Sequence, residues 1–349
     1  MTVHVEDSVL ESTCRRVLVG ARTAAGGEVC PPTLSLGAWA VVAAGLCHIS
    51  RERGVAALES VFQRQREDGL VPASAAARDG LALPIFASVF RWMFLHLSGV
   101  EPPLAARLGR LLTRLDRLHG QLFRRRDPVH WSSPGDERVL RVVSAIDRPA
   151  LDVGVNAVLV QAETDLMDVA MQTRVPAHGM LVRRTRRATV LLKRSWSGED
   201  GLFRSWRDGW VDPPTAEGLL PLYAGVAHPP HARVIWERYL EPGRGFWSLH
   251  PLSTLPVEHP DYEPGAPGRG AVCPLLSWLM LDGLQRYGLG GHAHQLHHAT
   301  LHLAREFGIH EAYDSQTGVG VGGPDDPVTA AVILMMLRAP YYDRERCIY

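Results

Sequence analysis

The sequence predicts an all-α protein whose helical hairpins close into a ring, and three observations support this fold class. Apolar residues recur at helical spacing along most of the 349 residues. Hardly any segment shows the strict apolar–polar alternation that is typical of strands. The joints between the apolar-striped segments contain Gly and Pro and alternate between short and long. Helices that are joined in this way form hairpins, and the long loops then gather at one mouth, where a site can be built.

The expected helices follow one another along almost the whole chain. Their apolar stripes cover residues 36–49, 54–66, 83–98, 103–123, 153–173, 180–196, 215–227, 231–239, 275–287, 292–307 and 329–337. The long connections are rich in Gly, Pro, Trp and acidic residues and cover 124–151, 198–214, 240–274 and 308–327. A stacked helical solenoid would instead repeat one motif about every 34 to 47 residues. The sequence has no such repeat.

Composition limits the classes of function. With 46% hydrophobic residues, the chain can bury a large core as one or two domains. Lys+Arg and Asp+Glu balance at 37 each, which argues against nucleic acid or an anionic membrane surface as a partner. Residues 1–16 lack the apolar core of a signal peptide, and no apolar run of about 18 residues follows, so we expect a cytoplasmic protein with no membrane segment. Five scattered cysteines indicate reduced thiols rather than disulfides or a zinc site.

Three local motifs have simple structural interpretations. His294, His298 and His302 share one face of an expected helix, but no HExxH accompanies them, so solvated or packed imidazoles are expected rather than a metal site. The basic run RRTRR at 183–187 is expected to be a solvated helix face. VGVGG at 319–323 follows no expected strand and precedes no Lys-Ser/Thr, so it does not predict a phosphate-binding loop. We therefore expect no metal and no organic cofactor.

Several stretches, in one order along the chain, carry a resemblance to a known family. They are QRQREDGLVP at 63–72, the region 125–149 that ends in SAIDRP, GLLPLYAGVA at 218–227, the region 246–288 and GIHEAYDSQTGVGVGG at 308–323. Together they resemble the trehalase and mannosylglycerate-hydrolase-like glycosidases, which are inverting enzymes. The resemblance spans about residues 33–338. It implies an all-α (α/α)6 toroid, the six-hairpin glycosidase-like barrel, as a single domain over residues 1–349.

The resemblance also implies a pair of catalytic carboxyl groups, because Glu311 falls on the family's general base and Asp147 on its general acid. An inverting glycosidase holds such groups about 6.5 to 9.5 Å apart, one protonated and one ionised. Apolar neighbours of Asp147 favour the protonated form, and polar neighbours of Glu311 favour the carboxylate. We expect contacts to a small-molecule substrate from other side chains of these loops: Arg269, Tyr313, Asp314, Gln65, Trp206 and Trp247.

The sequence departs from the family pattern at positions that shape the sugar pocket. Aromatic or acidic family residues fall here on small or apolar ones, namely Gly37, Ala38, Val143, Gly268, Cys273 and Val328. A wider and less polar mouth is expected, and three functions remain open. The first is an inverting glycoside hydrolase acting on a small glycoside or glycoconjugate. The second is the same barrel used for isomerisation, dehydration or cyclisation in secondary metabolism, and the third is a non-catalytic ligand-binding protein.

Overall fold

The computed structural model describes residues 2–24, 26–27, 30–74, 80–82, 84–124, 129–133, 136–137, 149–211 and 213–338. Contacts divide the chain into two compact units. Unit 1 comprises Met1–Val17, Val139–Ala145 and Ser195–Tyr349, and unit 2 comprises Leu18–Arg138 and Ile146–Arg194. The single domain expected from the sequence therefore stays a prediction.

Helices dominate both units, and the only strands in the described ranges form three two-stranded ladders. Helix α1 (Thr2–Ala24) contributes to both units. Unit 2 then contains α2 (Leu36–Cys47), α3 (Arg51–Gln63), α4 (Phe86–Ser98), α5 (Pro102–Gly109), α6 (Leu111–Arg124), β1 (Trp131–Ser132), β2 (Ala150–Leu151), α7 (Val153–Thr173) and α8 (His178–Ser195). Unit 1 contains β3 (Trp196–Ser197), β4 (Leu202–Phe203), a 3-10 turn (Ala216–Leu219), α9 (Leu220–Tyr223), α10 (Pro229–Tyr239), α11 (Pro274–Arg286), α12 (Gly290–Phe307), β5 (His310–Tyr313), β6 (Gly320–Pro324) and α13 (Pro327–Arg338).

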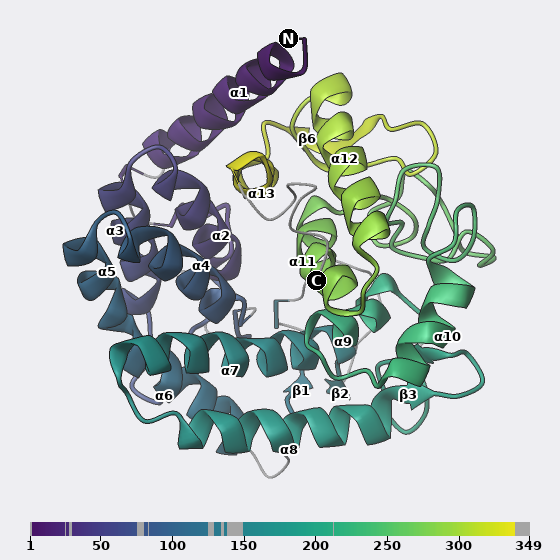
Figure 1. The fold of residues 1–349 in the computed structure, drawn as a ribbon, viewed down its shortest axis with the longest axis horizontal. Helices are drawn as coiled ribbons and strands as arrows, with labels where there is room; N and C mark the ends of the chain where they lie inside the picture. Colours follow the sequence, from purple (N-terminus) through teal and green to yellow (C-terminus); the bar gives the residue numbers. More distant parts are fainter. Residues whose placement is uncertain are drawn as a thin grey trace. The chain divides into compact units, whose positions relative to one another are not determined.

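Strongly buried helices alternate with amphipathic ones along the chain. Helices α2, α4, α7, α9, α11 and α13 bury most of their residues, and each of the first five is followed by at least one helix with a solvated face. Within unit 2, α2 packs against α3 and α4, and α7 packs against α4 and α6 (Figure 1). Within unit 1, α11 packs against α9, α12 and α13. This alternation is what a sequence of helical hairpins with one core-facing helix each requires.

Side-chain caps set the start of several buried helices. The Asp152 carboxylate accepts a 2.8 Å hydrogen bond from the Val155 amide at the start of α7, and α7 ends at Arg174 in the left-handed conformation. The Asp326 carboxylate accepts a 2.7 Å hydrogen bond from the Thr329 amide in the first turn of α13. Such caps satisfy amide groups that have no partner inside the helix.

The structure corrects two of the expected elements and adds one. The helix expected over 103–123 is divided into α5 and α6 at Arg110, and the helix expected over 215–227 is a 3-10 turn followed by the short α9. Helix α1 was not expected, because charged residues surround its apolar stripe of Leu10, Cys14, Val17 and Leu18, which the structure buries. In unit 1, ion pairs join Asp7 of α1 to Arg305 of α12, and Glu11 of α1 to Arg338 of α13.

The RRTRR run is only partly the solvated helix face that the sequence predicted: Thr185 and Arg186 are exposed, but two arginines face the interior. Arg187 is completely buried and Arg183 is largely buried, and both approach the buried carboxylate of Glu163 on α7. His119 of α6 lies 3.4 Å from the same carboxylate. The two arginines are four residues apart on α8, so they lie on one face of the helix. Unit 2 therefore contains a buried ionic cluster between α6, α7 and α8.

No helix within the described ranges combines the length and the apolarity that a membrane-crossing segment needs. The described cysteines are free thiols. Burial raises the pKa of Cys14, Cys30 and Cys47 to about 12, so these thiols stay protonated and unreactive.

Candidate active site

Three segments of unit 1 are joined through Val272, which precedes α11. Its amide donates to the Tyr313 carbonyl at 2.7 Å, and the Tyr313 amide donates back to the Val272 carbonyl at 3.0 Å. Val272 also forms an antiparallel bridge with Ser253. Loop 246–272 and strand β5, which lie far apart in the sequence, are therefore held together by backbone hydrogen bonds.

Glu311 lies on β5, in the ladder with β6. The register pairs Ala312 with Val321, and it is irregular between His310 and Ala312. Glu311 occupies this irregular position, and its side chain is exposed. Because backbone pairing fixes the position of β5, the Glu311 carboxylate is exposed to a ligand while its Cα atom is held in place.

Cys273 lies within electrostatic reach of Glu311. Burial raises the pKa of its thiol to about 11, and the negative charges of Asp326 and Glu311 act in the same direction. A small thiol therefore lies within electrostatic reach of Glu311, at the position where the resemblance placed a family tryptophan.

Gly37, in unit 2, lies against an acidic side chain. The Glu137 carboxylate lies against Gly37, where it accepts hydrogen bonds from the Ser35 hydroxyl at 2.5 Å and the Gly37 amide at 3.2 Å. A Cβ atom at residue 37 would collide with this carboxylate. Glu137 thus fills the space that the glycine leaves, a pairing that no pattern in the sequence indicates.

Tyr313 does not have the substrate-facing position expected of it. Its side chain is fully buried, and its hydroxyl donates a 2.7 Å hydrogen bond to the Gly308 carbonyl. Burial raises the pKa of this phenol well above its usual value. Tyr313 packs with Val272 and Leu303, so its role is to anchor β5.

Asp314 organises the turn that follows β5. Its carboxylate accepts 2.8 Å hydrogen bonds from the amides of Gln316 and Thr317. Burial alone would raise the pKa of Asp314, but hydrogen bonds from Thr317 and Gln316 outweigh burial and hold the pKa below its usual value. Asp314 is therefore an ionised group that shapes the turn.

Tyr262 and Ser315, which the sequence reasoning missed, fasten this turn to loop 246–272. The Tyr262 hydroxyl lies 2.7 Å from the Ser315 hydroxyl and accepts a 3.1 Å hydrogen bond from the Gln316 side chain. Both residues lie in stretches that carry the family resemblance, but those stretches do not show that the two side chains meet. The folded loops bring them together.

Arg269 is exposed and forms an ion pair with Glu263, whose side chain is also exposed. The backbone closes the same turn, because the Glu263 amide donates to the Arg269 carbonyl at 2.8 Å. An exposed ion pair contributes at most about 1 kcal/mol, so the guanidinium can exchange Glu263 for a ligand oxygen at little cost.

The two expected tryptophans differ in exposure. Trp247 is buried, and its ring centroid lies 5.1 Å from that of His292 in an edge-on arrangement. Trp206 is half-buried in loop 198–214, where its backbone forms a bridge with Trp210. Trp206 thus keeps an accessible surface for stacking, whereas Trp247 mainly supports the loop.

The remaining two site predictions concern unit 2 and the undescribed part of the chain. The Gln65 side chain donates to the carbonyls of Gly69 and Arg114 at 2.8 and 2.9 Å, so both of its N–H groups are used within the protein. Asp147 lies outside the described residues.

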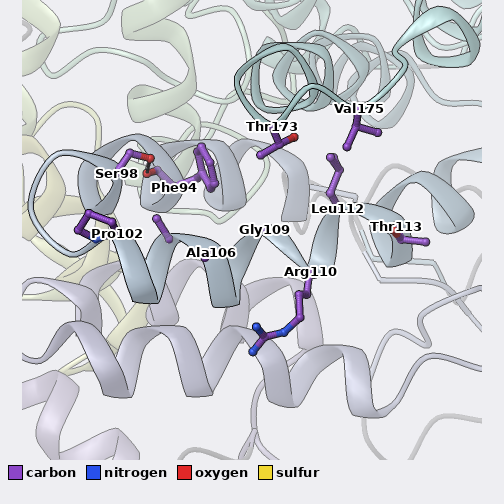
Figure 2. A pocket seen from close by; sticks show the side chains of 11 residues that line it. Phe94, Ser98, Pro102, Ala106, Gly109, Arg110, Leu112, Thr113, Thr173 and Val175 are labelled. Atoms are coloured by element: carbon purple, nitrogen blue, oxygen red, sulfur yellow. Dashed lines mark hydrogen bonds between the residues drawn. The ribbon is translucent and has the colours of Figure 1, made fainter.

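A separate pocket of about 440 Å³ opens in unit 2 between α4, α5, α6 and the end of α7 (Figure 2). Its lining is mainly apolar and includes Phe94, Leu112 and Val175, with Arg110 at its margin. None of the expected site residues lines it.

In the part of the chain that the structure describes, no three His, Cys, Asp or Glu side chains are arranged to hold a metal ion. His294 and His298, two of the three histidines on the face noted in the sequence, contact each other, with their Nε2 atoms 3.2 Å apart.

Comparisons with known proteins identify the family. Residues 135–325, more than half of the chain, match the model of the mannosylglycerate hydrolase MGH1-like glycoside hydrolase domain. Mannosylglycerate hydrolase from Thermus thermophilus is 32% identical over 197 residues, which cover 54% of this chain and 45% of that relative. Mannosylglycerate hydrolase MGH1 from Selaginella moellendorffii is 31% identical over 193 residues, which cover 53% of this chain and 38% of that relative. The aligned region thus spans less than half the length of these curated relatives.

Solved structures show the fold. A mannosylglycerate hydrolase from Thermus thermophilus in complex with glucose matches with a TM-score of 0.82 at 23% identity, over 94% of this chain and 100% of that chain. The neutral trehalase Nth1 from Saccharomyces cerevisiae matches with a TM-score of 0.63 at 15% identity, over 89% of this chain and 73% of that one. The predicted all-α, (α/α)6-barrel fold is confirmed by these likenesses. The chain belongs to the MGH1-like glycoside hydrolase family, as the resemblance in its loops indicated.

Proposed function

We propose that this protein is an inverting glycoside hydrolase that cleaves a small glycoside of the mannosylglycerate type. The observation that supports it most is the setting of Glu311, an exposed carboxylate on a strand that Val272 and β6 hold in place, within the region that matches the family model. Relatives that share this region are mannosylglycerate hydrolases.

In the proposed reaction, Glu311 acts as the general base and Asp147 as the general acid. The Glu311 carboxylate takes a proton from a water molecule as that water attacks the anomeric carbon. Asp147 gives its proton to the glycosidic oxygen, which leaves with the second product as a hydroxyl group. Attack from the face opposite the leaving group inverts the anomeric centre, and the two carboxyl groups exchange protonation states once per turnover.

Direct substrate contacts are proposed for Arg269 and Trp206, and supporting roles around the substrate for Asp314, Gln65 and Trp247. Arg269 is the best placed for an anionic group such as the glycerate carboxylate, because its present partner Glu263 is exposed and easily replaced. Trp206 can offer a ring face to a sugar. The contributions of Gln65 and Asp314 are indirect, through the turns that their hydrogen bonds stabilise.

The test is hydrolysis of mannosylglycerate followed by proton NMR, which distinguishes the sugar anomers as they are released. The first product anomer should be opposite to that of the substrate. Glu311→Gln and Asp147→Asn should each lower kcat by about 10² to 10⁴ fold, the usual contribution of one acid–base group. Glu306→Gln makes the same isosteric change at an exposed position on α12 and should leave kcat unchanged.

Two outcomes would reject parts of this proposal. Unchanged turnover in Glu311→Gln would remove Glu311 from the mechanism. Release of the anomer with the configuration of the substrate would exclude single-step inversion, whatever the effect of the two variants.

A further inference from the structure

We infer that Gly322 is a positioning residue for Glu311, because the Glu311 carboxylate rests on the bare backbone of β6 at this residue. The inference rests on the proposed role of Glu311 as general base. A Cβ atom at residue 322 would lie 3.0 Å from the Glu311 Cβ and 3.1 Å from its Oε2. Both distances are shorter than ordinary van der Waals contact, so residue 322 can carry no side chain unless Glu311 moves.

The backbone conformation of Gly322 explains why β6 comes so close to Glu311. Its φ is +81°, a conformation that L-residues with a side chain rarely adopt. It lies opposite the irregular part of β5, where the register shifts between His310 and Ala312. The positive φ and the register shift together bring the β6 backbone against Glu311.

Two other glycines serve as controls, because they separate the effect of crowding by a new side chain from the effect of a positive φ. Gly288 has a φ of +75° but has nothing within 4 Å of its hypothetical Cβ. Gly323 is the next residue along β6, and its hypothetical Cβ also has open space. Gly322 combines a positive φ with a contact to the proposed base, and neither of the other two does so.

Displacing Glu311 should affect catalysis more than substrate binding. A misplacement of a catalytic group by about 1 Å can lower the rate by about 10² fold. The hypothetical Cβ of residue 322 is tighter against Glu311 than ordinary contact, so an alanine methyl group would push the carboxylate by a few tenths of an ångström. A displacement of that size corresponds to a loss of about 4 to 10 fold in rate.

The experiment compares Gly322→Ala with Gly288→Ala and Gly323→Ala, using mannosylglycerate hydrolysis and thermal unfolding. We expect Gly322→Ala to lower kcat by about 4 to 10 fold, with KM within about twofold of wild type, and to lower Tm because alanine disfavours a positive φ. Gly288→Ala should lower Tm by a similar amount, since it forces the same conformation on alanine, but should leave kcat unchanged. Gly323→Ala should leave both kcat and Tm unchanged.

The failures of this inference and of the proposed function can be told apart. If Glu311→Gln abolishes turnover while Gly322→Ala keeps the wild-type kcat, the positioning role is overturned and the function stands. If Glu311→Gln remains active, the proposed function fails first. If Gly322→Ala does not fold, Gly322→Asn, which tolerates positive φ better, should show the same fall in kcat. If neither Gly322 variant folds while Gly288→Ala is stable, then glycine at residue 322 is required for folding, and the inference is overturned.

Discussion

Replacement of Glu163 by Gln should destabilise the protein strongly, because this carboxylate is the centre of the buried ionic cluster in unit 2. Arg183 contacts it with two nitrogen atoms, at 2.8 and 3.0 Å, and Arg187 approaches to 3.5 Å. His119 lies 3.4 Å away. Without the negative charge, the guanidinium of Arg187 would remain in the protein interior with no compensating partner.

The magnitude follows from the pKa of Glu163. Burial alone would raise this pKa, but His119 and Arg183 outweigh burial and lower it from 4.5 to about 2. One pKa unit corresponds to about 1.4 kcal/mol, so the ionised form contributes about 3 kcal/mol to the free energy of unfolding. Breaking one partner of a buried ion pair costs about 3 to 5 kcal/mol in other proteins. We expect Glu163→Gln to lose about 3 to 5 kcal/mol.

The pH dependence has a definite sign. Since the folded protein lowers the pKa, the contribution of Glu163 is fully present above the unfolded value of 4.5 and is lost as the pH falls towards about 2. The difference between wild type and Glu163→Gln should therefore be constant from pH 7 to about 5 and should shrink below pH 4.5.

Urea denaturation followed by far-UV circular dichroism measures this difference. Asp116→Asn is the matched control, because Asp116 pairs with the same Arg183 but is half-exposed, and it should lose less than about 1 kcal/mol. A loss below about 1 kcal/mol in Glu163→Gln, or a loss that does not change between about pH 5 and pH 3, would refute the electrostatic argument.

Arg187, which pairs with Glu163, is charged but poorly stabilised in the interior, and a double variant can test this. Burial lowers the pKa of Arg187 to about 10, since loss of hydration and repulsion by Arg183 together outweigh the attraction of Glu163. Arg187 thus stays charged at neutral pH without being well stabilised. Adding Arg187→Met to Glu163→Gln should therefore restore more than half of the lost stability; no recovery would mean that the packing of Glu163, and not its charge, is what matters.

Two further predictions concern a helix cap and a substrate contact. Asp152→Ala removes the acceptor of the Val155 amide at the start of α7 and should lower the free energy of unfolding by about 1 kcal/mol; urea denaturation measures it, and a neutral result would mean that water replaces the cap. Arg269→Ala should raise the KM for mannosylglycerate by about 10 fold or more, since a hydrogen bond to a charged group contributes about 1.5 to 3 kcal/mol, with little change in kcat. A normal KM would exclude Arg269 as a carboxylate-binding residue.

The sequence predicted the helices better than the side chains of the site. Buried helices such as α2 and α7 are uninterrupted apolar stripes, so their positions were correct to within a few residues. Helix α1 was missed although it buries Leu10, Cys14, Val17 and Leu18 at helical spacing, because the charged residues between them hide this short stripe. Its ion pairs to α12 and α13 join residues that are remote in sequence. Arg187 was misjudged for a similar reason: periodicity places residues on a face of a helix but does not reveal a carboxylate on the helix packed against that face.

Within the site, the motif around Glu311 located the loop but not the direction of each side chain. In a regular strand, Glu311 and Tyr313 would point to the same side. The register shift between His310 and Ala312 breaks this alternation, so Glu311 is exposed while Tyr313 is buried. A bulge depends on the pairing of two strands, and neither strand's sequence reveals it alone.

The position of Val272 between Ser253 and Tyr313 has a consequence for how the protein could be altered. Residues 253 and 272 lie in one loop and residue 313 lies on β5, yet the three backbones form one small ladder. Lengthening the loop between residues 253 and 272, or the connection from residue 272 to β5, would disturb this ladder, so natural or laboratory variation of substrate preference should proceed through side-chain replacement. Amide protons of Val272 and Tyr313 should accordingly exchange with solvent at a common rate, as members of one opening event.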